Sequence, residues 1–96
     1  MIIHVVMFKF KNKSEESIRK AENMLLDMEG KIEELKHIEV GRDITKSDRS
    51  YDVALLTKFE SVEDLKAYQI NPLHVEIAEY LVSASESIVA VDYESF

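Results

Sequence analysis

The sequence predicts an α+β fold in which helices cover one face of a four-stranded antiparallel sheet. Three observations support this prediction: strand-type and helix-type apolar patterns alternate, polar turn segments separate them, and two strands are apolar on both faces. Among 96 residues there are only two glycines and one proline, and 46% are hydrophobic, which is typical of a compact globular chain. We therefore expect one domain over residues 1–96.

The first predicted strand runs from Ile2 to Lys11, because β-branched and aromatic residues dominate it and no helical spacing emerges. Ser14 then suits the N-cap of a helix, with Glu15 and Glu16 in the first turn, where the helix dipole favours negative charge. Gly30 suits the left-handed position after the helix. The apolar residues of this predicted helix recur every three or four positions, as in a helix that covers a sheet: Ile18, Ala21, Leu25 and Met28.

Two further strands are predicted in the middle of the chain. One runs from Ile38 to about Ile44 and is followed by the polar connector TKSDRS. The other spans Tyr51 to Phe59, and Ala54 and Leu56 make its second face partly apolar. This strand is therefore apolar on both sides, and the residues on its first face are Tyr51, Val53, Leu55, Thr57 and Phe59.

A pair of helices follows the third strand. Ser61, with an aspartate three residues later, resembles a capping box at the start of a helix near Val62. This helix must stop or kink before Pro72. Asn71 can cap a second helix with Pro72 in its first position, and we expect that helix to continue to about Ser83.

A last strand, Ser87 to Tyr93, completes the order strand, helix, strand, strand, helix pair, strand, which is the ferredoxin-like pattern. Helices on one face leave the other face uncovered. We place Val6, Phe8 and Phe10 on that open face, where exposure to water would forgo about 1.5 to 3 kcal/mol per side chain. The simplest cover is a second copy in a twofold dimer, whose two sheets would form an α/β barrel with a ligand cavity between them.

Charge and composition exclude several partners and sites. The net charge is -7, so the surface repels phosphate backbones and anionic bilayers, and we expect neither nucleic acid nor a membrane as partner. No cysteine is present, which excludes disulfides and thiolate metal sites. The N-terminal segment lacks the pattern of a signal peptide or a membrane span, so a cytoplasmic location is expected. There is no glycine-rich phosphate loop and no G-x-S-x-G motif, and we expect no cofactor.

Two residues around the helix break are candidate catalytic groups. His74 falls at the third position of the helix capped by Asn71, where the positive end of the dipole disfavours protonation. A neutral imidazole there can act as a hydrogen-bond partner or general base, whereas the structural alternative is a histidine that caps or packs at the kink. Tyr68 can donate a hydrogen bond to a ligand carbonyl or phenolate oxygen, or it simply covers the helix end.

The third candidate is His4, which shares a strand face with three apolar residues and therefore needs a hydrogen-bond partner. His74 or a bound ligand can supply that partner, and a satisfied core histidine is the alternative. His37 follows a polar turn and is expected to be solvated. The spacing of the three histidines does not indicate a transition-metal site.

Three segments, IIHVVMFKFK, FESVEDLKAYQINPLH and VDYE, resemble the stress-responsive dimeric A/B barrel (Dabb) domain family over nearly the whole chain. The resemblance implies a homodimeric ferredoxin-like barrel, although most members have no established activity. It also implies site residues. A plant polyketide cyclase of this family performs an aldol condensation, its catalytic histidine and tyrosine match His74 and Tyr68, and its first-strand histidine matches His4.

The chain departs from that pattern at two places. Leu25 and Leu26 stand where the cyclase has a further pocket tyrosine, which argues against the same substrate. In NPLH, Asn71 occupies the position of the first histidine of the common HPxH motif, so one residue that can cap a helix replaces another. The resemblance also implies a candidate magnesium site, because some relatives bind this ion through backbone carbonyls in the region of Glu29, Ile32 and Leu35.

Three hypotheses for function follow from these residues. The leading one is a homodimer that binds a small apolar or aromatic molecule in its barrel, with His74, Tyr68 and His4 as polar contacts. The second is an enzyme of the polyketide cyclase or cofactor-free monooxygenase type, in which His74 is the general base and Tyr68 the oxyanion donor. The third is a structural stress protein with a filled barrel. A cavity of roughly a few hundred cubic ångströms beside His74 would favour the first two.

Overall fold

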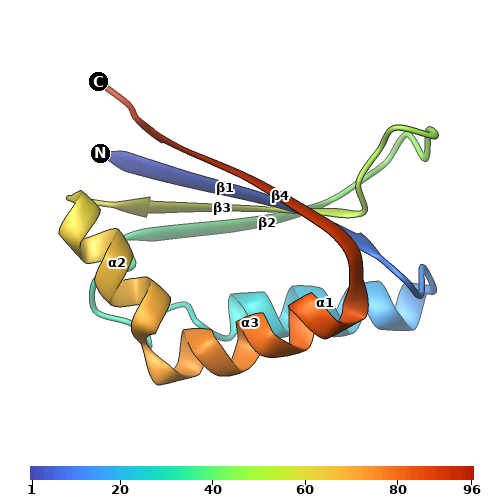
Figure 1. The fold of residues 1–96 in the computed structure, drawn as a ribbon, viewed down its shortest axis with the longest axis horizontal. Coiled ribbons are helices and arrows are strands. Elements are labelled where there is room, and N and C mark those ends of the chain that lie inside the picture. Colours follow the sequence, from blue (N-terminus) through green and yellow to red (C-terminus); the bar gives the residue numbers. More distant parts are fainter.

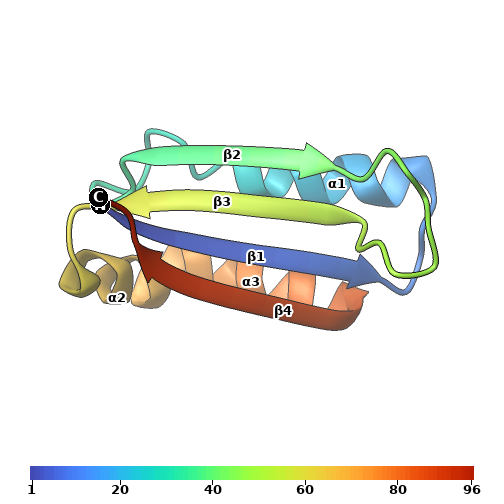
Figure 2. The same ribbon diagram turned by 90° about the horizontal axis from the view of Figure 1, so that it is seen from above.

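The computed structural model describes residues 1–96 and contains a four-stranded antiparallel sheet and three helices. The sheet order is β2-β3-β1-β4 (Figure 2), and Figure 1 shows all three helices beneath one face of the sheet. The ferredoxin-like prediction is therefore confirmed. No helix has both the length and the apolar character that crossing a bilayer requires. In chain order the elements are β1 (Ile2–Phe10), α1 (Glu15–Leu26), β2 (His37–Arg42), β3 (Val53–Phe59), α2 (Val62–Ile70), α3 (Pro72–Ala84) and β4 (Ser85–Glu94).

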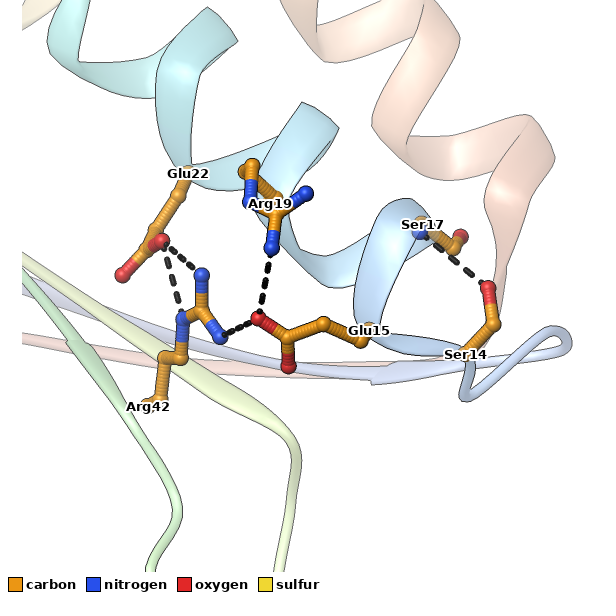
Figure 3. Close-up of polar contacts among 6 residues, drawn as sticks. All are labelled: Ser14, Glu15, Ser17, Arg19, Glu22 and Arg42. Atoms are coloured by element: carbon orange, nitrogen blue, oxygen red, sulfur yellow. Dashed lines mark hydrogen bonds and ion pairs between the residues drawn. The ribbon is translucent and has the colours of Figure 1, made fainter.

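The helices begin at the residues that the capping pattern predicts. The Ser14 hydroxyl accepts the backbone N–H of Ser17 at 3.2 Å, which starts α1 (Figure 3). Asn71 acts on two helices at once. Its side-chain oxygen accepts the Leu73 N–H at 2.9 Å to start α3, and its own N–H donates to the Tyr68 carbonyl at 3.2 Å to end α2. One residue thus sets the break between the two helices.

Strand ends differ from the prediction where side chains form turns. β2 ends at Arg42 rather than near Ile44, because the Asp43 carboxylate accepts the Lys46 N–H at 2.7 Å and folds the chain into a turn. β3 begins later and β4 begins earlier than predicted. These local differences leave the order and pairing of the strands unchanged.

The helices cover the face of β1 that we predicted to be open. Val6, Phe8 and Phe10 are 8%, 5% and 1% exposed, so their placement on the open face is wrong. The register pairs Val6 with Leu55 and Phe8 with Val53, and these residues belong to the core beneath the sheet. Both sets of alternate side chains on β1 are apolar, so alternation alone does not say which set the helices cover. The helix residues in the same core are Ile18, Ala21, Leu25, Leu65, Tyr68, Ile77 and Leu81.

The open face of the sheet is nevertheless apolar. Val5 pairs with Leu56 on one side and Val91 on the other, so the three side chains lie next to one another. Val91 is 54% exposed and Tyr93 is 47% exposed. We call this surface the open-face patch, and its residues are Val5, Met7, Leu56, Val89, Val91 and Tyr93.

An ion-pair cluster ties the edge strand β2 to α1 (Figure 3). Arg42 donates from Nε and Nη2 to Glu22 at 2.9 and 2.7 Å, and from Nη1 to Glu15 at 2.6 Å. The hydrogen bonds to Glu22 and Glu15 raise the pKa of Arg42, and the bond from Arg42 lowers the pKa of Glu15. We call these three residues the Arg42 bridge. It fixes α1 against the sheet.

Candidate functional site

A cavity of about 150 Å³ lies between the sheet and the helices, inside a single chain. It is lined by 13 residues, of which 11 are hydrophobic, and they come from β1, β3, β4, all three helices and the turn after α1, which contributes Met28. The cavity beside His74 therefore lies within one subunit, and a further cavity between the sheets of two subunits stays a prediction. Val6 and Phe8 line one side of this cavity, because they lie on the face of the sheet that the helices cover. Its volume is also smaller than we expected.

All three predicted site residues line this one cavity. The ring centroids of Tyr68 and His74 are 4.4 Å apart, and those of His4 and Tyr68 are 6.2 Å apart in an edge-to-face arrangement. Tyr68 lies in the last turn of α2 and His74 in the first turn of α3. The helix break at Asn71 therefore turns both side chains toward the same space.

His74 has one ring nitrogen occupied and one free for a ligand. Its Nδ1 lies 3.1 Å from the backbone carbonyl of Gln69, which can only accept, so Nδ1 carries the proton and Nε2 has a lone pair. Burial lowers the pKa of His74; the hydrogen bond to Gln69 opposes this shift, and the nearby His4 adds to it. The imidazole is thus a neutral acceptor at pH 7, as we predicted, with burial as the main cause.

Tyr68 is completely buried, and its hydroxyl has no hydrogen-bond partner in the protein. Its ring packs against Phe59 with centroids 4.8 Å apart. Burial raises the pKa of Tyr68, so the hydroxyl keeps its proton and remains a donor at neutral pH. A buried polar group without a partner costs about 1–3 kcal/mol, so this hydroxyl gains most from a ligand atom that accepts its hydrogen bond.

His4 obtains its partner from the last strand. Its Nδ1 is hydrogen-bonded to the carboxylate of Asp92, which lies directly opposite His4 in the β1–β4 register. His4 is thus a histidine with a partner inside the protein, which is the alternative that the sequence left open, and that partner is Asp92 rather than His74. Because a carboxylate accepts, Nδ1 donates and Nε2 remains available to the cavity. In the sequence, Asp92 is marked only by its place in VDYE, and the signal that identifies it as a partner is a charged residue on an apolar strand face.

The remaining predicted positions lie outside this cluster or have a packing role. His37 is half-exposed on β2 and lies 3.9 Å from Glu39. Leu25 lines the cavity, whereas Leu26 is 41% exposed. The structure holds no group of three His, Cys, Asp or Glu side chains suited to a metal ion. Among the backbone carbonyls predicted to bind magnesium, that of Ile32 accepts the N–H of Leu35. Magnesium binding stays a prediction.

Comparison with known proteins gives a family and several relatives. The model of the stress responsive A/B barrel domain (Dabb) family matches residues 2–95. The Arabidopsis thaliana stress-response A/B barrel domain-containing protein DABB1 is 31% identical over 97% of this chain, which spans 46% of that relative's length. Olivetolic acid cyclase from Cannabis sativa is 29% identical over 94% of this chain and 92% of its own. A crystal structure of a dimeric ferredoxin-like protein of unknown function from Bacteroides fragilis superposes with a TM-score of 0.81 at 28% identity, covering 98% of this chain and 95% of that one.

Proposed function

The chain belongs to the stress responsive A/B barrel domain family, and from that premise we propose that it binds a small apolar or aromatic molecule in the cavity beside His74. The unpartnered hydroxyl of Tyr68 carries this proposal, because a ligand oxygen there would satisfy a buried donor inside an apolar wall. The same hydroxyl argues against a structural protein whose interior is filled. We also propose that residues 1–96 form one domain of this family and that the protein is cytoplasmic.

A ligand-shift experiment tests binding. Single-ring aromatic compounds and short polyketide-like compounds should raise the melting temperature of the protein, because they bind the native state only. The variant Ala78→Leu, which narrows the cavity, should lose these shifts, and Ala67→Leu on α2, outside the cavity, should keep them. If every compound that shifts the native protein shifts the Ala78→Leu variant equally, the ligands bind elsewhere and the proposal fails.

We also propose that the protein is a homodimer joined through the open-face patch. Exposed apolar side chains on the uncovered face support this, as does the dimeric relative from Bacteroides fragilis. Val91→Asp should convert the dimer to monomers in analytical ultracentrifugation, because it would bury a charge in the interface. Val75→Asp is a matched control, since Val75 is 39% exposed on α3, one of the helices beneath the opposite face of the sheet (Figure 1). A native protein that sediments as a monomer at micromolar concentration contradicts the dimer.

A second candidate function is proton-transfer catalysis. The free Nε2 of His74 can remove a proton from a carbon beside a carbonyl, and the Tyr68 hydroxyl can hydrogen-bond the oxygen as negative charge develops on it. The similarity to a relative named as a cyclase supports this candidate. The test is deuterium exchange at the methyl group of acetophenone in D₂O, followed by NMR. An enzyme would accelerate exchange and lose the effect in His74→Ala, whereas a binding protein would leave the rate at that of buffer.

A further inference from the structure

The volume of the cavity matches a ligand of about one ring. Apolar cavities of about 150 Å³ hold a single benzene-sized molecule, whereas drug-sized ligands occupy about 300–1,000 Å³. The cavity of this chain has a volume of about 150 Å³. Leu25, Met28 and Ile77 are among its walls and are 2%, 0% and 4% exposed, so these walls are fixed by the core.

The polar groups of the cavity define what the ring must carry. Tyr68 presents a hydroxyl that lacks an acceptor, and His74 presents the lone pair of Nε2, which lacks a donor. The two rings are in contact, with centroids 4.4 Å apart, and both line the cavity, so their polar groups belong to one end of it. A hydroxyl on the ligand meets both needs, since its oxygen accepts from Tyr68 and its proton is donated to His74.

Charge excludes the aromatic acids that otherwise fit the volume. The 13 lining residues include no lysine or arginine. The carboxylate of Asp92 is hydrogen-bonded to His4, which lines the cavity, and would repel a second carboxylate there. A ligand carboxylate would therefore lose its hydration without gaining a cation.

From these observations we propose that the cavity selects a neutral, single-ring phenol, with the ligand hydroxyl held between Tyr68 and His74. This inference rests on the proposed binding function and deepens it by naming the ligand class. Leu25 gives the cavity an apolar wall, so the ligand hydroxyl binds at the polar end of the cavity, beside Tyr68 and His74.

The test compares phenol with toluene, which has the same ring and a methyl group in place of the hydroxyl. ¹H–¹⁵N NMR titration at pH 7.5 suits weak ligands and also locates them. Phenol should shift the amide signals around Tyr68 and His74, and Tyr68→Phe should weaken phenol about tenfold while leaving toluene within about twofold. Tyr80→Phe removes a hydroxyl from α3 outside the cavity and should change neither affinity. Benzoate should bind at least about tenfold more weakly than phenol.

The outcomes separate this inference from the proposed function. Suppose that toluene binds and that Tyr68→Phe lowers the affinity for phenol no more than the affinity for toluene. The cavity then binds apolar rings without recognising a hydroxyl, and only the inference is contradicted. Benzoate or 2-naphthol binding more tightly than phenol would also overturn the inference alone. If none of the four compounds shifts the signals around the cavity in the native protein, both fall. The spectrum of each variant reports whether it is folded.

Discussion

The Arg42 bridge and the cavity cluster of His4, Tyr68 and His74 are two polar clusters that differ in whether every polar group has a hydrogen-bond partner. In the bridge, at the surface, each of the three charged side chains has a partner between 2.6 and 2.9 Å away. In the cavity, His4 is bonded to Asp92 and His74 to Gln69, but the completely buried Tyr68 hydroxyl has no partner. A group that serves only the fold would be expected to have a partner or to be replaced by an apolar one. The unpaired hydroxyl is therefore the stronger indication of function.

Removing the Tyr68 ring should have the largest effect on stability. The ring is fully buried against Phe59 and His74, so Tyr68→Ala should lower the free energy of unfolding by about 3–5 kcal/mol, as for other large-to-small aromatic changes. Urea denaturation measures this value. A loss below about 1 kcal/mol would show that the ring is not part of the core.

Removing only the Tyr68 hydroxyl should increase the free energy of unfolding. Tyr68→Phe keeps the packed ring and removes the unsatisfied group, so the unliganded protein should gain about 1 kcal/mol in free energy of unfolding. The half-buried Tyr80 is the control, and Tyr80→Phe should stay within about 0.5 kcal/mol of the native protein. A destabilised Tyr68→Phe variant would mean that the hydroxyl serves the fold, and the contrast between the two clusters would disappear.

Breaking the bridge should produce a smaller loss, and one that depends on salt. Glu22→Gln weakens two hydrogen bonds to Arg42 and should lower the melting temperature slightly in dilute buffer. At about 1 M NaCl, where the Debye length is about 3 Å, the difference should largely vanish. Glu29→Gln changes an exposed glutamate outside the bridge and should have no effect. The stabilisation from Tyr68→Phe should not respond to salt, because no charge is involved.

The smallest effects are on the pH dependence of stability, where the two clusters should act in different pH ranges. The pKa of His74 is lowered by burial, so the unfolded chain binds a proton more readily than the native protein does. Stability should therefore fall as pH drops below about 6.5, the ordinary histidine pKa. The bridge acts at lower pH: the bond from Arg42 lowers the pKa of Glu15 from 4.5, and its contribution is lost as pH falls through the lowered value.

Thermal melts from pH 4 to 8 distinguish these two ranges. His74→Gln should flatten the curve just below pH 6.5, whereas His37→Gln, at an exposed position, should leave it unchanged. Glu15→Gln should alter only the acidic end. A curve that keeps its slope below pH 6.5 in His74→Gln would show that another group causes the dependence.

The sequence by itself determined those features that depend on a few neighbouring residues. Ser14 and Asn71 cap helices because each side chain reaches an N–H within three residues. The break at Asn71 places Tyr68 and His74 on either side of one turn, so their proximity follows from local geometry. The order of strands and helices along the chain follows in the same way, from the spacing of apolar residues.

Only the tertiary structure decided which of the two apolar faces of β1 the helices cover. It also decided that Asp92, 88 positions away, is the partner of His4, and that the cavity holds about 150 Å³ within one chain. The physical reason is that a strand with period-two alternation presents two sets of side chains and does not mark either as inside. Register and cavity volume arise when strands and helices distant in sequence pack together, and no local pattern of residues contains them.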